Sequence, residues 1–139
     1  MLQTMRSFFS TNTVSSTYGS MGLLVLRVAV ALLMLTHGIA KMSNFSAMSV
    51  NFDPIGIGGG LSLSLVVFAE VFCSIGLLLG LLTRAAALAL VINMLVAVLV
   101  AHSGDPLATK ELGLMYLACY CVLLLTGPGK YSLDKLIWK

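Results

Sequence analysis

Four long apolar runs follow one another along the chain, separated by short polar segments. The runs cover residues 21–42, 61–82, 85–102 and 111–126. Each is close to the ~20 residues that an α-helix needs to cross the hydrocarbon core of a bilayer. The runs are continuous, which favours helical spans over the short alternating strands of a membrane barrel. The pattern therefore predicts an all-α integral membrane protein, built as one antiparallel bundle of four transmembrane helices.

The polar segments divide the chain into a membrane domain and two tails. Residues 43–60 hold Asp53-Pro54 and a glycine cluster, and residues 103–110 hold Gly104 and Pro106, so both segments are expected to be loops. Residues 1–20 are rich in Ser and Thr and are expected to form a loose cytoplasmic tail, with an interfacial turn near Met5–Phe9. The membrane domain then covers 21–127. Gly127-Pro128-Gly129 stops the last helix, so 128–139 is expected to be a second cytoplasmic tail.

Composition supports the membrane assignment. Hydrophobic residues make up 59% of the 139 residues and charged residues 9%, whereas a soluble domain carries about 25% charge. The net charge of +3 is too small to indicate a nucleic-acid partner, and the partner that the composition implies is the lipid bilayer. Cys73, Cys119 and Cys121 all fall inside the predicted spans, where they are interpreted as small buried apolar side chains.

Charges in the connecting segments predict the orientation. The side that holds both termini and the turn at 83–84 carries more basic residues: Arg6, Arg84, Lys130, Lys135 and Lys139. The other side carries Lys41 and Lys110, partly offset by Asp53, Asp105 and Glu111. Because cytoplasmic flanks of membrane spans are enriched in Lys and Arg, both termini are expected in the cytoplasm of a bacterial inner membrane.

Glu70 is the most informative polar residue, because it lies in the middle of the second run, ~13 Å below the outer surface. An ionisable group at that depth is costly and marks a functional site by default. His37 and Lys41 are four residues apart and share one helix face, and His102 ends the third run on the same outer side. If these side chains face inward, they form a polar pocket open to the outer face. Such a pocket could bind the carbonyl oxygens of a quinone and pass protons, or it could be a packing network.

Two further polar residues complete the candidate set. Arg27 lies about two turns from the cytoplasmic end of the first run, and Asn93 lies near the middle of the third. The candidate ligand-binding residues are therefore Arg27, His37, Lys41, Glu70, Asn93 and His102. Each has a structural alternative: an ion pair for Glu70, snorkelling for Arg27 and Lys41, interfacial water for the histidines, and interhelical hydrogen bonding for Asn93. The sequence contains no catalytic motif of soluble enzymes, and no metal site is predicted.

Several segments together resemble the DoxX family. They are Arg27 followed by Leu-Thr-His37-Gly38-Ile-Ala-Lys41, then Phe68-Ala-Glu70 through Gly80-Leu-Leu-Thr83-Arg84, and the ending Leu125-Thr-Gly127-Pro128-Gly129-Lys130-Tyr131-Ser132-Leu133-Asp134. The resemblance covers roughly 21–135 and implies a small four-helix inner-membrane protein. It also implies association with membrane oxidoreductase assemblies, including a subunit of a thiosulfate:quinone or terminal quinol oxidase complex, and partnership with superoxide dismutase and a sulfurtransferase. Arg27, His37, Lys41, Glu70 and Arg84 match the family pattern.

Three functions follow as expectations. The first is a subunit of, or membrane anchor for, a quinone-linked oxidoreductase complex, with redox centres supplied by partner subunits because the chain has no cofactor motif of its own. The second is a non-catalytic scaffold or assembly factor, and the third is transport of a small solute or protons, which would need a homo-oligomer. Any enzymatic activity is expected to be that of an oxidoreductase subunit acting with partner redox proteins.

Overall fold

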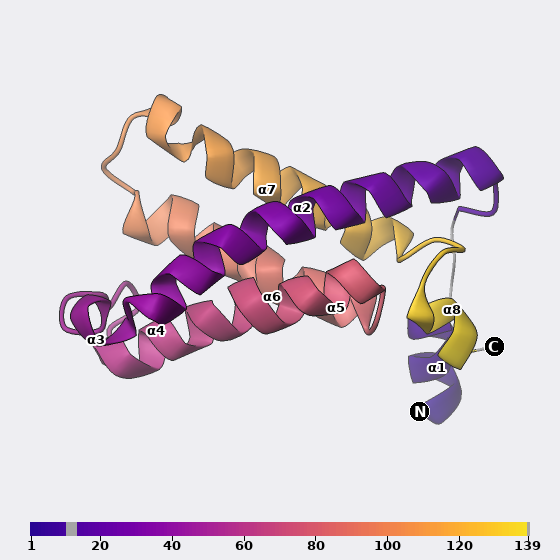
Figure 1. Ribbon diagram of the computed structural model, residues 1–139, viewed down its shortest axis with the longest axis horizontal. Coiled ribbons are helices and arrows are strands. Elements are labelled where there is room, and N and C mark those ends of the chain that lie inside the picture. Colours follow the sequence, from indigo (N-terminus) through magenta and orange to yellow (C-terminus); the bar gives the residue numbers. More distant parts are fainter. Residues whose placement is uncertain (11–13, 139) are drawn as a thin grey trace.

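The computed structural model of the protein describes residues 1–10 and 14–138, and the described residues contain no strand. Four helical segments are long and apolar enough to cross a membrane (Figure 1). The first is α2 (Thr17–Ser43); the second joins α4 (Gly59–Val67), η1 (Phe68–Cys73) and α5 (Ser74–Leu79). The third joins α6 (Thr83–Val96) and η2 (Ala97–Ala101), and the fourth is α7 (Leu107–Thr126). The predicted fold class, an all-α bundle of four spans, is confirmed.

The bundle core is apolar and its outer surface is apolar as well. Leu63, Leu77, Leu90 and Leu123 are fully buried between the helices. Many other large apolar side chains point outward, among them Leu32, Phe68, Phe72, Leu99 and Leu125. An apolar exterior of this kind is expected where lipid, rather than water, surrounds the helices.

Residues 1–20, expected to be a loose tail with an interfacial turn near Met5–Phe9, are largely helical where the structure describes them. Residues Leu2–Ser10 form the helix α1, and α2 begins at Thr17, before the apolar run itself. The early start has a local cause, because the Ser16 hydroxyl accepts a hydrogen bond from the Gly19 backbone N–H (3.0 Å) and caps the helix. One serine of this Ser/Thr-rich segment is therefore a helix cap.

The segment between α2 and α4, expected to be a loop, contains the short helix α3 (Phe45–Met48) and an ordered turn. The Asp53 carboxylate organises that turn. It accepts hydrogen bonds from the backbone N–H groups of Ile57 (3.0 Å) and Gly58 (2.9 Å) and from the Ser62 hydroxyl (2.7 Å). These bonds to the charged form lower the pKa of Asp53, with the Ser62 bond the largest cause.

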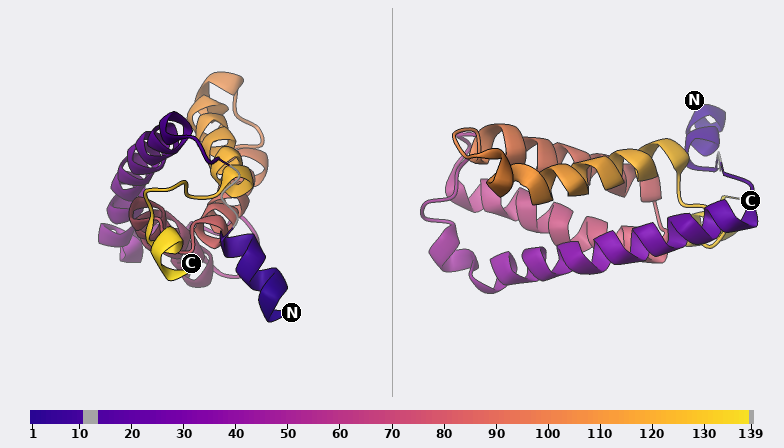
Figure 2. Two further views of the ribbon diagram at one scale, coloured as in Figure 1. Left: turned by 90° about the vertical axis from the view of Figure 1, so that its right-hand side faces the viewer. Right: turned by 90° about the horizontal axis from the view of Figure 1, so that it is seen from above.

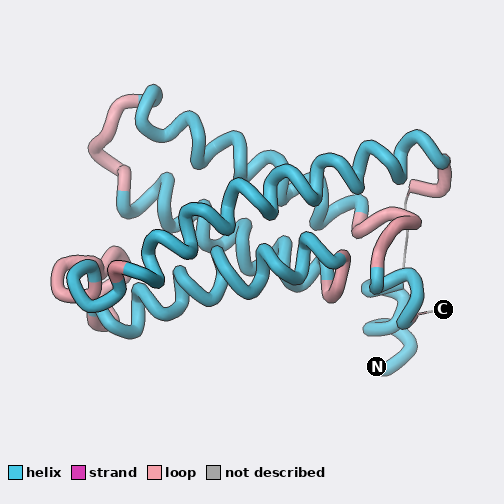
Figure 3. The backbone as a smooth tube through the Cα atoms, in the orientation of Figure 1, coloured by secondary structure: helices cyan, strands magenta, loops and turns pink. Residues whose placement is uncertain are grey.

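Both termini lie at one end of the bundle (Figures 1 and 2). There α1 contacts α8 (Leu133–Ile137), and the two short helices lie beyond the ends of the spans. The connections around α3 and between η2 and α7 lie at the opposite end, where the tube in Figure 3 turns back on itself. The charged residue Lys139, counted above toward the cytoplasmic side, lies outside the described residues.

The C-terminal segment, expected to be a separate tail, packs into the bundle. Gly127, Pro128 and Gly129 are buried, and the buried guanidinium of Arg27 donates to the carbonyl oxygens of Pro128 (2.6 Å) and Tyr131 (2.7 Å). Since these carbonyls satisfy two of its nitrogen atoms, Arg27 holds the segment against α2.

A second contact ties the same segment to the start of α6. The carboxylate of Asp134 accepts hydrogen bonds from the backbone N–H groups of Leu82 (2.7 Å) and Thr83 (2.8 Å). Its own N–H donates to the Gly80 carbonyl (2.8 Å). Leu82, in the left-handed region at φ 48°, has no side chain that could cap the helix. Asp134 therefore supplies from a distance the N-cap that the local sequence lacks.

Candidate functional site

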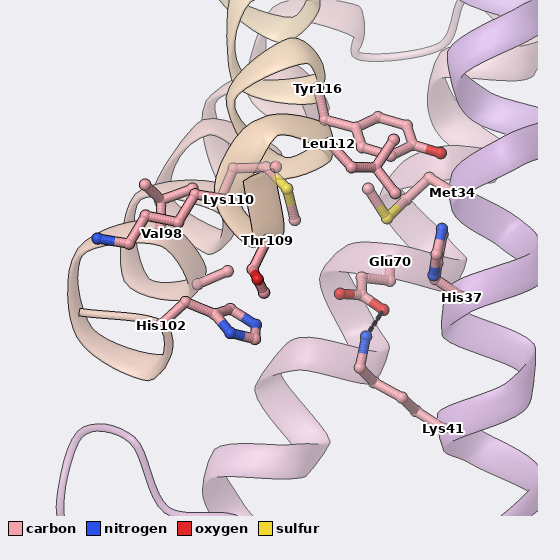
Figure 4. Close-up of a pocket in the computed structure, with 13 residues that line it drawn as sticks. Met34, His37, Lys41, Glu70, Val98, His102, Thr109, Lys110, Leu112 and Tyr116 are labelled. Atoms are coloured by element: carbon pink, nitrogen blue, oxygen red, sulfur yellow. Dashed lines mark hydrogen bonds and ion pairs between the residues drawn. The ribbon is translucent and has the colours of Figure 1, made fainter. Parts of the chain in front are cut away.

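Four of the six candidate residues meet at the end of the bundle that lies away from the termini. His37, Lys41, Glu70 and His102 line a cavity of about 170 Å³ between α2, η1, η2 and α7 (Figure 4). The remaining lining residues are mostly apolar: Met34, Met94, Ala97, Val98, Thr109, Lys110, Leu112, Gly113 and Tyr116. Toward this end the ribbons of α2 and α7 lie apart, whereas they cross beyond the middle of α7 in the view of Figure 1.

Glu70 is held at both oxygens of its carboxylate. Oε2 lies 2.6 Å from Nζ of Lys41, and Oε1 accepts a hydrogen bond from Nδ2 of Asn93 (3.1 Å). Glu70 is 3% exposed, whereas the Lys41 side chain is 24% exposed and reaches in from the cavity mouth. A buried carboxylate needs such partners, because burying it alone costs several kcal/mol. Lys41 and Asn93 thus make a charged Glu70 possible at this depth.

A glycine lets the two sides of this ion pair approach. A Cβ atom added to Gly38 would lie 2.8 Å from the Val71 side chain and 2.9 Å from the Glu70 backbone. Only a residue without a side chain allows α2 to pack this closely on η1, which brings Lys41 within reach of Glu70. Small residues commonly serve this purpose where membrane helices cross.

Both walls of the cavity contain a π-helical turn. Glu70 belongs to η1, and the cavity residues Ala97 and Val98 belong to η2, which ends just before His102. Turns of this type are rare, and they occur frequently at functional sites. Sequence periodicity gave no sign of them, because one widened turn barely changes the spacing of apolar residues.

Sequence reasoning missed Tyr116, which lies beside His37 in the cavity wall. Their ring centroids are 6.0 Å apart and the rings are perpendicular, so they meet edge to face. Tyr116 also stacks on the fully buried Tyr120, with 6.0 Å between centroids. The available signal was a phenol in an apolar run at about the depth of His37.

The other two candidates occupy different places. Asn93 supports Glu70 from α6 and is not among the residues that line the cavity. Arg27 lies at the terminal end of the bundle, where it binds the C-terminal carbonyls. The ion pair expected as an alternative for Glu70 is formed by Lys41. In residues 1–10 and 14–138, no three His, Cys, Asp or Glu side chains are grouped as a metal would require.

The family model DoxX matches residues 22–103, and this range contains all six candidate residues. The chain belongs to the DoxX family. It is 30% identical to the inner membrane protein YqjF of Escherichia coli, over 85% of this chain and 93% of the relative. It is also 32% identical to an uncharacterized protein of Haemophilus influenzae (82% of this chain, 89% of the relative) and 29% identical to an uncharacterized membrane protein of Mycobacterium tuberculosis (87% and 84%). No solved structure matches the chain.

DoxX membership and the four apolar helices together make this a multi-pass membrane protein, and the name of the Escherichia coli relative supports the inner membrane. Tyr116 and Asp134 lie beyond the residues that the family model matches.

Proposed function

We propose that the cavity binds the head group of a membrane-soluble quinone, and that this DoxX protein serves as a subunit of, or membrane anchor for, a quinone-linked oxidoreductase complex. The observation that carries the proposal is Glu70: a buried carboxylate, held at both oxygens, beside a small cavity within the spans. Ionisable groups kept inside a membrane at such cost serve a function in most proteins that have them.

The size of the cavity suits a head group rather than a whole ligand. Sites that enclose drug-sized molecules measure roughly 300–1,000 Å³, whereas this cavity measures about 170 Å³. One small ring would fill it, and the hydrophobic tail of the same molecule would extend into lipid. Such a molecule arrives through the membrane and needs no aqueous entry path.

The lining offers hydrogen-bond donors to the carbonyl oxygens of a quinone. Lys41 carries three N–H donors and uses one on Glu70, and the His37 ring has a nitrogen that can donate. Apolar side chains such as Met34 and Leu112 give the faces of a ring something to pack against. When bound, the quinone supplies the redox chemistry, and partner redox proteins supply the electrons.

The charge pattern adds an orientation to the proposal. The end with both termini carries Arg6, Arg84, Lys130 and Lys135, so by the positive-inside rule it faces the cytoplasm. The cavity then lies in the outer half of the membrane and opens toward the outer face. Resemblance to a family associated with membrane oxidoreductases supports the same function.

The test uses the native complex and, separately, the isolated chain with two variants. The complex, solubilised in mild detergent, is analysed by mass spectrometry for redox partners and extractable quinone. The chain in lipid nanodiscs is then titrated with a short-tailed ubiquinone analogue, alongside Glu70→Gln and the control Glu111→Gln, an exposed carboxylate that does not line the cavity. Glu70→Gln removes the carboxylate that holds the Lys41 ammonium beside the cavity. A hydrogen bond from a charged donor such as Lys41 contributes about 1.5–3 kcal/mol, so the variant is expected to weaken binding about tenfold or more.

Equal quinone affinity in wild type and Glu70→Gln would contradict the proposed site. Partner proteins without quinone or any redox cofactor would instead favour the scaffold, and solute flux through liposomes that contain this chain alone would favour transport.

A further inference from the structure

His102 contacts both the cavity and the solution outside it. It follows η2 and begins the turn into α7, and its side chain is 49% exposed although it lines the cavity. Figure 4 shows the imidazole directed from this turn toward the space in front of Glu70 and Lys41. Of the two cavity histidines, His102 is the one next to a polar loop.

Asp105 fixes the position of that ring. Its Oδ2 lies 2.6 Å from Nδ1 of His102, and its backbone N–H donates to the His102 carbonyl (3.1 Å). Asp105 thus fixes the ring of His102 through its side chain and the backbone of His102 through its main chain. Pro106 follows directly and restricts the backbone of the same turn.

This contact decides which ring nitrogen can exchange a proton. An ionised carboxylate only accepts hydrogen bonds, so Nδ1 must carry the proton in the bond to Asp105. In the neutral ring the free lone pair then lies on Nε2. A proton from water can add to Nε2 and leave from Nε2 to an oxygen of a bound head group. One proton enters and one leaves, the Nδ1 proton stays in place, and no electron passes through the ring.

The other charged groups at the cavity are less suited to this step. Glu70 accepts hydrogen bonds at both oxygens, from Lys41 and Asn93, and a proton lost from Lys41 would leave the buried Glu70 carboxylate without its cation. Lys110, on α7, donates to the carbonyl of Ser103 (3.2 Å).

His37, on α2, is one helical turn further from the end of the span than Lys41, and its ring packs against Tyr116. His37 is exposed as well, so exposure does not separate the two rings. Among the described groups that line the cavity, His102 is the exposed one whose carboxylate partner leaves a ring nitrogen unprotonated.

We infer that protons enter the cavity through the His102 ring, which we call the proton port, and that Asp105 is the positioning residue that keeps Nε2 available for proton transfer. This inference rests on the proposed function, because the proton acceptor is the bound quinone head group. It assigns to this turn a role in proton transfer between the outer solution and the membrane site.

The first test needs no ligand. The imidazole nitrogens of ¹⁵N-histidine-labelled protein are observed by NMR in nanodiscs for wild type, Asp105→Asn and the conservative variant Asp105→Glu. Wild type is expected to show the Nδ1–H tautomer at His102, Asp105→Asn is expected to lose it, and Asp105→Glu is expected to retain it at least in part. The same tautomer in wild type and Asp105→Asn would overturn the inference, whatever the ligand.

The second test uses the native complex with a short-tailed quinone. Asp105→Asn is expected to lower the rate of quinone reduction about tenfold and to leave quinone affinity within about twofold of wild type. Added imidazole is expected to restore part of the rate in His102→Ala, because a free ring can take over proton transfer. Glu111→Gln serves as the control and is expected to behave as wild type.

The two failures can be told apart. If wild type binds no quinone, the proposed function fails, and the inferred role of His102 fails with it. If wild type binds and reduces quinone while Asp105→Asn and His102→Ala do so at the wild-type rate, only the proton port is overturned.

Discussion

Replacement of Asp134 should destabilise the whole bundle, although this residue lies outside the four spans. Its side chain is 2% exposed and accepts two short hydrogen bonds, from the N–H groups of Leu82 and Thr83. Its charge also interacts with that of the buried Arg27. The variants Asp134→Asn and Asp134→Ala remove these interactions in two steps.

The magnitudes follow from the contacts. A hydrogen bond to a charged group contributes about 1.5–3 kcal/mol, and Asn keeps one acceptor oxygen, so Asp134→Asn should cost about 2 kcal/mol. Ala removes both acceptors and leaves the N-terminus of α6 uncapped, so its cost should be about 4 kcal/mol. Removing the charge beside the buried Arg27 adds to the cost of both variants, because a buried ion that loses a compensating charge is destabilising.

The free energy of unfolding can be measured in bicelles by steric trapping. The control is Lys135→Gln, a neighbouring exposed side chain that should change stability by less than about 0.5 kcal/mol. Amide hydrogen exchange should also rise at Leu82 and Thr83 in Asp134→Asn. If Asp134→Asn were as stable as Lys135→Gln and these amides stayed protected, the capping role of Asp134 would be refuted.

Three further predictions concern the ion pair and the loop. Gly38→Ala should lower the free energy of unfolding by about 1–3 kcal/mol, because the added methyl group overpacks the contact with η1. Gly22 has open space around it on the same helix, so Gly22→Ala should be neutral or slightly stabilising. Thermal unfolding in detergent compares the two variants, and equal stabilities would contradict the close packing at Gly38. Lys41→Met should be less stable than the double variant Lys41→Met/Glu70→Gln, because the single change leaves a buried carboxylate without its cation. If the double variant lost as much stability as the two single variants added together, Lys41 and Glu70 would not be energetically coupled. Because the pKa of Asp53 is lowered in the folded protein, its contribution to folding stability is complete above the unfolded pKa of about 3.9 and is lost as the pH falls through the lower folded pKa. A titration of the Asp53 carboxyl carbon by NMR should give a midpoint below about 3.9. A midpoint at or above about 3.9 would contradict the hydrogen bonds of this turn.

The number and length of the spans could be predicted from the sequence because membrane crossing imposes one simple requirement. A run of about 20 apolar residues satisfies it, and the four runs coincide with the four long helices. Depth along each run also placed Glu70, His37, Lys41 and His102 at the same end. Helix geometry alone was therefore enough to predict that most of the candidate residues lie close together.

The contacts of Arg27 could not be predicted in the same way. Its partners are backbone carbonyls of Pro128 and Tyr131, 101 and 104 positions away, and every residue has such a carbonyl. The role of Asp134 was equally hidden, since a carboxylate near the C-terminus is usually solvated. In both cases the decisive fact is where the chain returns after the fourth span, and local pattern does not contain it.

Photoaffinity labelling tests most directly whether the cavity beside the Glu70–Lys41 pair holds a quinone head group. The native complex is irradiated with an azido-quinone, and the labelled peptides are identified by mass spectrometry. We expect label on cavity residues of α2 and α7, such as Met34 and Tyr116, and loss of that label when unmodified short-tailed quinone competes. Label confined to the lipid-facing surface, as at Phe68 and Phe72, and unaffected by the competitor, would contradict it.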